Sequence, residues 1–325
     1  MNGTPAPLAA GAPDGRPGTP PPASGVFAWL RLLRVPNLLT VPGDPWAGAV
    51  LAAMTRGPEA SAAVLLLAGL SSLGLYAFGL ILNDLCDLAE DRRERPHRPL
   101  ASGAVGVPAA WAAAAGCAAV GLGCAVAVSR AAAVTAAILA LVITAYNAGL
   151  KRTGWPGWLT MGACRGLSLA LGAAFAGWNG TPLVVTVAAG TTLYIAAITC
   201  VSSRETLGWR RNGVFFLPPA AAALCLLTAW GVAGIGGATW RLGASAGLGA
   251  WLLWRGWRLA RTVSARRTEP VAVQRFVGAS IRGIILLQAG VLALGPGLTG
   301  PGLAALLVAV ALPAASRLGR RFYGS

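Results

Sequence analysis

Long apolar runs follow one another from Phe27 almost to the end of this chain, and they limit what it can fold into. Each run holds about 18–25 residues, enough for one helix to cross a bilayer core about 30 Å thick. Charged residues make up only 11% of the chain, whereas soluble domains contain about 25%. We therefore expect an all-α, polytopic membrane helix bundle with about nine to ten transmembrane helices. The expected spans are about 27–54, 62–83, 108–128, 131–150, 156–178, 183–202, 214–233, 239–256, 277–295 and 300–317.

The two ends of the chain differ from the apolar part. Residues 1–25 are rich in Pro, Gly and Ala and have almost no bulky hydrophobic side chains. Such a segment cannot bury a core, so we expect a disordered tail there. Because it has no basic stretch before an apolar core, it does not have the pattern of a signal peptide. The sequence predicts one transmembrane domain over 26–318 and a short basic tail over 319–325.

Basic residues outnumber acidic ones by 26 to 10, and they gather in alternate loops between the apolar runs. With the N-terminus in the cytoplasm, the other side holds only Arg56, Arg130 and Arg241, which fits the positive-inside rule. We therefore expect an integral protein of a bacterial cell membrane, with its N-terminus and the loops after its second, fourth and sixth helices in the cytoplasm. A net charge of +16 would suggest nucleic acid in a soluble protein. Membrane topology accounts for the charge here, so the lipid bilayer is the expected partner and nucleic acid is not.

Half of the ten acidic residues lie in one short segment after the second apolar run. Asp84, Asp87 and Asp91 are spaced i, i+3 and i+7, which places their side chains on one face of a helix. Like charges this close repel each other unless a cation lies between them. Mg²⁺ is commonly held by one or two carboxylates together with substrate phosphates. The spacing therefore predicts a Mg²⁺ site at the end of the second helix.

A basic loop broken by proline, residues 92–100, follows these acids. Arginine forks match phosphate oxygens, so acids for a metal followed by arginines for phosphate indicate a diphosphate site. A solvated loop with incidental ion pairs is the alternative. It does not account for the gathering of half the acids in one segment.

Three stretches of the sequence resemble the UbiA family of intramembrane prenyltransferases. The run Asn83-Asp-x-x-Asp-x-x-x-Asp91 resembles the NDxxDxxxD signature of that family. Residues 95–103 resemble the RPxRPxxSG stretch that follows it, and residues 146–152 are similar to a Tyr…Lys-Arg segment. The resemblance covers roughly residues 27–295. It implies Mg²⁺-dependent transfer of an isoprenoid chain from a prenyl diphosphate to an aromatic or other electron-rich small-molecule acceptor.

The resemblance also implies roles for individual residues. The second Asp-rich motif of the family is missing from residues 199–209, where Glu205 is the only acid. The Ser-Arg-Glu form of this segment resembles the EboC-like branch of the family. The implied metal ligands are Asp84, Asp87, Asp91 and Glu205; the implied diphosphate-binding residues are Asn83, Arg95 and Arg98; and the implied catalytic residues are Asp84, Asp87, Lys151, Arg204 and Tyr146.

Two charged residues fall inside apolar runs, Asp44 in the first and Arg165 in the fifth. An ionisable residue at membrane depth is costly and usually faces an internal cavity. With Asn37 these residues are candidates for an acceptor pocket; the alternatives are a structural ion pair, or an Arg165 side chain that snorkels to the membrane interface. Tyr146 and Tyr194 are candidates to face an allylic cation through their rings, or else to pack in the core.

Two other functions are compatible with parts of this pattern. A UbiA-type membrane terpene cyclase would use the same metal site but let the prenyl chain attack itself. The sequence leaves transferase and cyclase open. A transporter or channel could also be a basic ten-helix bundle, but it would not need clustered acids followed by arginines in one loop.

Overall fold

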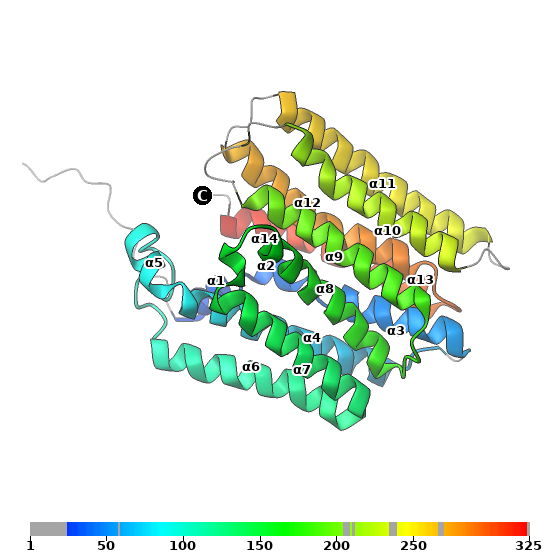
Figure 1. Ribbon diagram of the computed structural model, residues 1–325, viewed down its shortest axis with the longest axis horizontal. Coiled ribbons are helices and arrows are strands. Elements are labelled where there is room, and N and C mark those ends of the chain that lie inside the picture. The colour runs from blue at the N-terminus through cyan, green and yellow to red at the C-terminus, as the bar shows by residue number, and fades with distance from the viewer. Residues whose placement is uncertain are drawn as a thin grey trace, which may run out of the picture.

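The computed structural model describes residues 25–57, 59–203, 209, 212–233, 239–265 and 270–323, and within these ranges the secondary structure is entirely helical. The long helices lie side by side, and the short α5 stands at one end of the bundle (Figure 1). We call this end the Asp84 end, because α4 also finishes there. The elements are α1 (Gly25–Leu32), α2 (Val35–Leu38), α3 (Gly43–Arg56), α4 (Ala62–Cys86), α5 (Leu88–Glu94), α6 (Val107–Val128), α7 (Arg130–Ala148), η1 (Leu150–Arg152), α8 (Trp155–Phe175), α9 (Pro182–Ser202), η2 (Asn212–Phe216), α10 (Leu217–Ala233), α11 (Thr239–Ala265), α12 (Pro270–Leu292), α13 (Thr299–Leu306), η3 (Leu307–Ala311) and α14 (Leu312–Tyr323).

Most of the predicted spans lie within a few residues of an observed helix, but their number is not confirmed. Seven segments of the described chain are long and apolar enough to cross a membrane, against the nine to ten expected. Helices α8 and α11 are also long but fall outside this set, since arginines such as Arg165 and Arg255 lower their hydropathy. The seven are Ala62–Cys86, Val107–Val128, Arg130–Ala148, Pro182–Ser202, Gly213–Ala233, Pro270–Leu292 and Thr299–Gly319.

The first predicted span, 27–54, is wrong as a single helix. The chain there forms α1, α2 and α3, with breaks between them. Pro36 lies in the first turn of α2 and Pro42 is the N-cap of α3. Proline has no N–H to continue a helix from the preceding turn, so each begins a new helix here. Arg34, in the first break, has φ 47°, and it is the only non-glycine residue of the described chain with a positive φ.

The two ends of the chain were predicted to be tails. Residues 1–24 lie outside the described residues. At the other end, α14 continues to Tyr323, so most of the segment predicted as a basic tail is helical. The preceding stretch, Thr299–Gly319, corresponds to the last predicted span.

Helices α3 and α8 approach each other closely because glycines face the contact. A Cβ atom at Gly48 would lie 1.8 Å from the carbonyl oxygen of Leu169, and one at Gly172 would lie 1.9 Å from that of Pro45. Small residues at such contacts let helix backbones pack together in membranes, where lipid offers no hydrophobic gain for association. This contact holds the short α3 against α8 beside the cavity described below.

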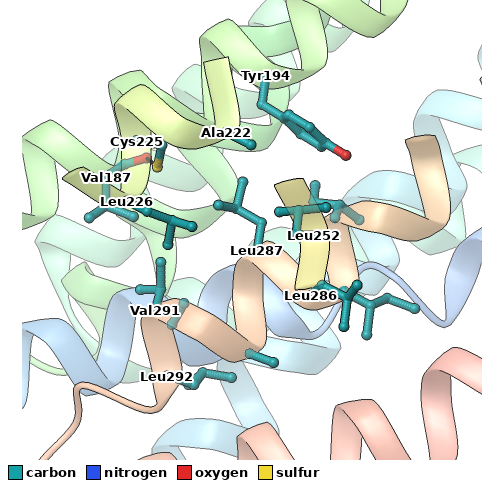
Figure 2. Packing of buried hydrophobic residues seen from close by; sticks show 14 of the residues in the cluster. Val187, Tyr194, Ala222, Cys225, Leu226, Leu252, Leu286, Leu287, Val291 and Leu292 are labelled. Atoms are coloured by element: carbon teal, nitrogen blue, oxygen red, sulfur yellow. Dashed lines mark hydrogen bonds between the residues drawn. The ribbon is translucent and has the colours of Figure 1, made fainter. Parts of the chain in front are cut away.

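A buried apolar cluster joins α9, α10, α11 and α12, and Figure 2 shows its packing. Leu226 of α10 and Leu287 of α12 are each 1% exposed within it. Tyr194 belongs to this cluster, with 2% exposure, and its hydroxyl donates to the carbonyl oxygen of Ser280 at 2.8 Å. Tyr194 therefore packs in the core, which decides between the two alternatives left by the sequence.

Candidate active site

A cavity of about 390 Å³ lies inside the bundle. Its lining along α4 includes Ser72, Tyr76 and Asn83, which share one face at helical spacing. At 1.5 Å per residue, the eleven-residue step from Ser72 to Asn83 gives the cavity a depth of about 16 Å along this helix. Asn83 marks its mouth at the Asp84 end, and Ser72 marks its deep part.

The cavity has two chemically different sides. One side, which we call the apolar side, is formed by α9 and α12. The other, which we call the polar side, is formed by the segment between α1 and α3 together with α4 and α8. The apolar side includes Ile195, Ile198, Val277, Ile281 and Ile284, with Thr199 and Ser202 at the end of α9 as its polar members. The polar side includes Asn37, Thr40, Ser72, Tyr76, Arg165 and Ser168.

Asp84 and Asp91 do not line the cavity but lie beside its mouth, next to Asn83 and Arg34, and are almost fully buried, at 4% and 2% exposure. Arg34 Nη2 donates to Asp84 Oδ1 at 3.1 Å. Arg98 Nη1 donates to Asp91 Oδ2 at 2.7 Å and lies 3.9 Å from Asp84 Oδ1. Arg95 is less engaged, because its Nη1 is 3.9 Å from Asp91 and nearly half of its side chain is exposed. Arg98 thus lies between the carboxylates of Asp84 and Asp91, where its positive charge offsets their mutual repulsion.

Asp87 contacts a different set of basic side chains, those of Lys151 and Arg152. Lys151 Nζ lies 2.7 Å from both of its carboxylate oxygens and donates to Asn83 Oδ1 at 3.2 Å. The turn η1 directly after α7 carries Lys151 and Arg152 to this place. Arg152 is 3.5 Å from Asp87 and 3.0 Å from Glu90, but its side chain is 63% exposed. Lys151 is therefore the less exposed partner of Asp87, with 12% of its side chain exposed, and Arg152 is a surface residue.

The expectation that the three aspartates share one face of a single helix needs correction. Helix α4 ends at Cys86, Asp87 has φ −93° and ψ 3°, and α5 begins at Leu88. The chain leaves ideal helical geometry at Asp87, so its carboxylate contacts other partners than those of Asp84 and Asp91.

The donor set at the mouth fits a hard divalent cation by its chemistry. It consists of carboxylate and amide oxygens, which Mg²⁺ prefers over nitrogen or sulfur. Within the described residues, no three His, Cys, Asp or Glu side chains lie close enough to hold one ion together. The remaining predicted members of the site, Arg204 and Glu205, lie outside the described residues.

The charges inside the membrane part form one connected network. Arg165 Nε lies 2.7 Å from Oδ2 of Asp44, which is 0% exposed. Gln288 of α12 donates to Asp44 Oδ1 at 2.6 Å and to the carbonyl oxygen of Thr40 at 2.9 Å. Arg165 donates to that same carbonyl oxygen at 2.7 Å. Asp44 does not line the cavity, whereas Asn37 and Arg165 do.

Sequence reasoning missed several residues and contacts of this site. The pairing of Arg34 with Asp84 is one such contact, since the two residues stand 50 positions apart in the chain. Gln288 is a lone amide in an apolar run, which is a signal that could have identified it. Tyr76 and Asn147 line the cavity beside the predicted Tyr146, and nothing in their local sequence distinguishes them.

These features define an integral membrane helix bundle with an internal cavity, beside one end of which acidic side chains are paired with basic ones. The family comparison agrees, since the model of the UbiA prenyltransferase family matches residues 45–277. The chain belongs to the UbiA prenyltransferase family. This confirms the resemblance and the class of enzyme expected from the sequence.

Individual relatives agree with this assignment. The chain is 33% identical over 160 residues to the digeranylgeranylglyceryl phosphate synthase of Ignicoccus hospitalis, a match to 49% of this chain and 51% of that protein. The chain thus spans about half the length of this curated relative. The apo structure of a UbiA homolog from Aeropyrum pernix K1 has a TM-score of 0.62 at 18% identity, covering 80% of this chain and 98% of that one. A UbiA homolog from Archaeoglobus fulgidus, bound to GPP and Mg²⁺, has a TM-score of 0.50 at 19% identity, covering 81% and 99%.

Proposed function

We propose that this protein transfers an isoprenoid chain from a prenyl diphosphate to a small electron-rich acceptor, with Mg²⁺ as cofactor. One observation carries the proposal: buried Asp84 and Asp91, paired with arginines, lie beside the mouth of a cavity that is lined there by Arg34 and Asn83 and that has an apolar side. A diphosphate at the mouth and a prenyl chain along the apolar side would match both regions. The GPP and Mg²⁺ bound by the Archaeoglobus homolog support this assignment.

The roles of the mouth residues follow from their charge and position. Asp84, Asp87, Asp91 and Asn83, together with Glu205, would hold Mg²⁺. The ion, when bound, neutralises diphosphate charge. Lys151, Arg95, Arg98 and Arg204 would bind diphosphate oxygens, and Arg34 is placed to join them. Fixed positive charge at a leaving group is often the largest single contribution to catalysis.

The cavity interior would protect the reactive carbon. When the C1–O bond breaks, its electron pair leaves with the diphosphate and C1 becomes electron-poor. The apolar side chains exclude water from C1, and the ring of Tyr146, which lines the cavity, could face the positive charge. The acceptor then bonds to C1 and loses a proton.

Purified protein incubated with Mg²⁺ and labelled geranyl, farnesyl and geranylgeranyl diphosphates tests this function. We expect diphosphate release, with the label appearing in a prenylated acceptor when membrane extract supplies one. Release of diphosphate together with a hydrocarbon and no acceptor would instead support the terpene cyclase. Failure to consume any of the three donors would refute the proposal.

The positive-inside pattern leads us to propose that the Asp84 end faces the cytoplasm. Single cysteines placed in the loops that contain Asp91, Lys151 and Glu205, at exposed positions such as Arg93 and Arg152, in a cysteine-free background should react with an impermeant thiol reagent only after cells are permeabilised. Ser61→Cys, at the opposite end of α4, is the matched control and should react in intact cells. Labelling of the three loops in intact cells would reverse the proposed orientation.

Glu205 is the only acid between the sixth and seventh predicted spans, so we propose that it completes the metal site. Glu205→Gln removes its charge but keeps its shape. Turnover should fall on the order of tenfold or more, and the Mg²⁺ concentration needed for half-maximal rate should rise. If both stay within about twofold of the parent, Glu205 only forms a surface ion pair, which contributes about 0–1 kcal/mol.

A further inference from the structure

The charged residues that line the cavity are already neutralised by buried or nearly buried carboxylates. Among the described lining residues, Arg34 and Arg165 are the only charged ones. Arg34 is paired with Asp84 at the mouth, where the diphosphate is proposed to bind. Arg165 is paired deeper inside with Asp44 at 2.7 Å. The deep part of the polar side therefore carries no net charge from its described residues.

This charge balance decides what kind of acceptor can bind there. An anionic acceptor must give up its hydration on entry, and only an unpaired cation would compensate for that loss. Arg165 is already paired with Asp44, and Gln288 of α12 donates a hydrogen bond to Asp44. A phosphate or carboxylate on the polar side would face Asp44 as a competing negative charge.

Hydrogen-bonding groups on the polar side, and on α7 where it packs against α4 and α8 of that side, suit hydroxyls. Asn147 lines the cavity and is 5% exposed. Its amide nitrogen donates to the carbonyl oxygen of Ile143 at 3.0 Å, while its Oδ1 has no hydrogen-bond partner in the described part of the chain. The hydroxyls of Ser72 and Ser168 lie 2.6 Å apart on the polar side. An unpaired amide oxygen requires a donor, which a ligand hydroxyl supplies.

We infer that the acceptor is an uncharged, hydroxyl-bearing molecule that binds on the polar side, and that Asp44 sets this preference by neutralising Arg165. The inference rests on the proposed prenyl transfer. The acceptor oxygen forms a new C–O bond with C1 of the prenyl chain, and the C1–O bond to the diphosphate breaks. Its electron pair leaves with the diphosphate, which also takes the hydroxyl proton. Asp44 acts as a positioning residue, because it contacts Arg165 rather than the cavity.

Matched acceptor pairs that differ only in charge test this inference. The probes are 4-hydroxybenzyl alcohol with 4-hydroxybenzoate, glucose with glucose 6-phosphate, and geranylgeranylglycerol with its phosphate. Transfer from labelled geranylgeranyl diphosphate gives kcat/KM for each, and diphosphate release is followed separately. Binding of the same probes is also titrated in the presence of geranyl thiolodiphosphate, which is turned over poorly. We expect the neutral member to be preferred by about tenfold or more wherever a pair is used or bound.

Two variants separate selectivity from folding. Asp44→Asn leaves Arg165 uncompensated and should shift the ratio of kcat/KM toward the anionic members by about tenfold. The double variant Asp44→Asn with Arg165→Gln restores neutrality and should bring back the preference for neutral probes. It also keeps the test informative if the single variant unfolds in detergent. Ser245→Ala, which removes a buried hydroxyl of α11 away from the cavity, is the control and should keep the parental ratio.

Each outcome supports or overturns the inference. Preference of the parent protein for the anionic members, in transfer or in binding, overturns it, and so does an unchanged ratio in a folded Asp44→Asn variant. If no diphosphate is released from any donor, the proposed prenyl transfer fails. The binding titration still measures the charge preference of the cavity in that case, so the two failures are distinguishable.

Discussion

Replacing Asp84 or Asp87 with alanine should abolish Mg²⁺-dependent turnover, lowering the rate on the order of 10³-fold or more. Each change removes a carboxylate proposed to hold the metal, and Asp84 is also the partner of Arg34 and Arg98. Rates are measured as diphosphate release over a Mg²⁺ titration, with EDTA as the metal-free reference. The variants should still elute as folded protein in detergent, because Arg34 keeps partial access to water at 32% exposure.

Glu90→Gln provides the matched control for these changes. Glu90 lies in α5 among the same acids, but its side chain is 42% exposed and it contacts the exposed Arg152. Its loss should change turnover by less than about twofold, as for a surface ion pair. Full activity in Asp84→Ala or Asp87→Ala, or rates unaffected by EDTA, would exclude the mouth as the metal site.

Lys151→Met should lower kcat on the order of 100-fold. The change removes the fixed positive charge that Lys151 places beside the proposed leaving diphosphate, and it keeps the length of the side chain. Lys151 is the only lysine of the chain and its side chain is 12% exposed between Asp87 and Asn83. Steady-state kinetics with each prenyl diphosphate separate kcat from KM. A fall in kcat with a smaller change in KM is expected for a group that acts on the leaving diphosphate.

The next residue in the chain supplies the control for Lys151. Arg152 also contacts Asp87, but at 3.5 Å and with 63% of its side chain exposed. Arg152→Gln should therefore keep kcat within about twofold of the parent. Equal losses in both variants would show that general positive charge, rather than Lys151 in particular, stabilises the departing diphosphate.

Much of this site could be predicted from the sequence because its chemistry is local. Asn83, Asp84, Asp87 and Asp91 stand within nine residues, and the arginines of 92–98 follow at once. Spacing on a helix brings such residues together whatever the rest of the fold does. Lys151 required more than spacing, and the resemblance of residues 146–152 to a known segment pointed to it.

Partners that come from distant parts of the chain could not be predicted in this way. Arg34, in the break before α2, meets Asp84 across 50 residues, and Gln288 meets Asp44 across 244 residues. The bend at Asp87, which turns its carboxylate to Lys151, depends on how α5 packs at the end of the bundle. Helical periodicity alone favours a straight continuation from α4 to α5.

The sequence by itself determined the membrane bundle, the positions of most helices and the acidic mouth. These follow from hydrophobic length and from charge spacing, which act over one helix at a time. Only the tertiary structure decided that Tyr194 packs in the core and Tyr146 lines the cavity, and that Asp44 neutralises Arg165. The physical reason is that burial and ion pairing depend on which helices become neighbours, and that choice is made by packing between segments far apart in the chain.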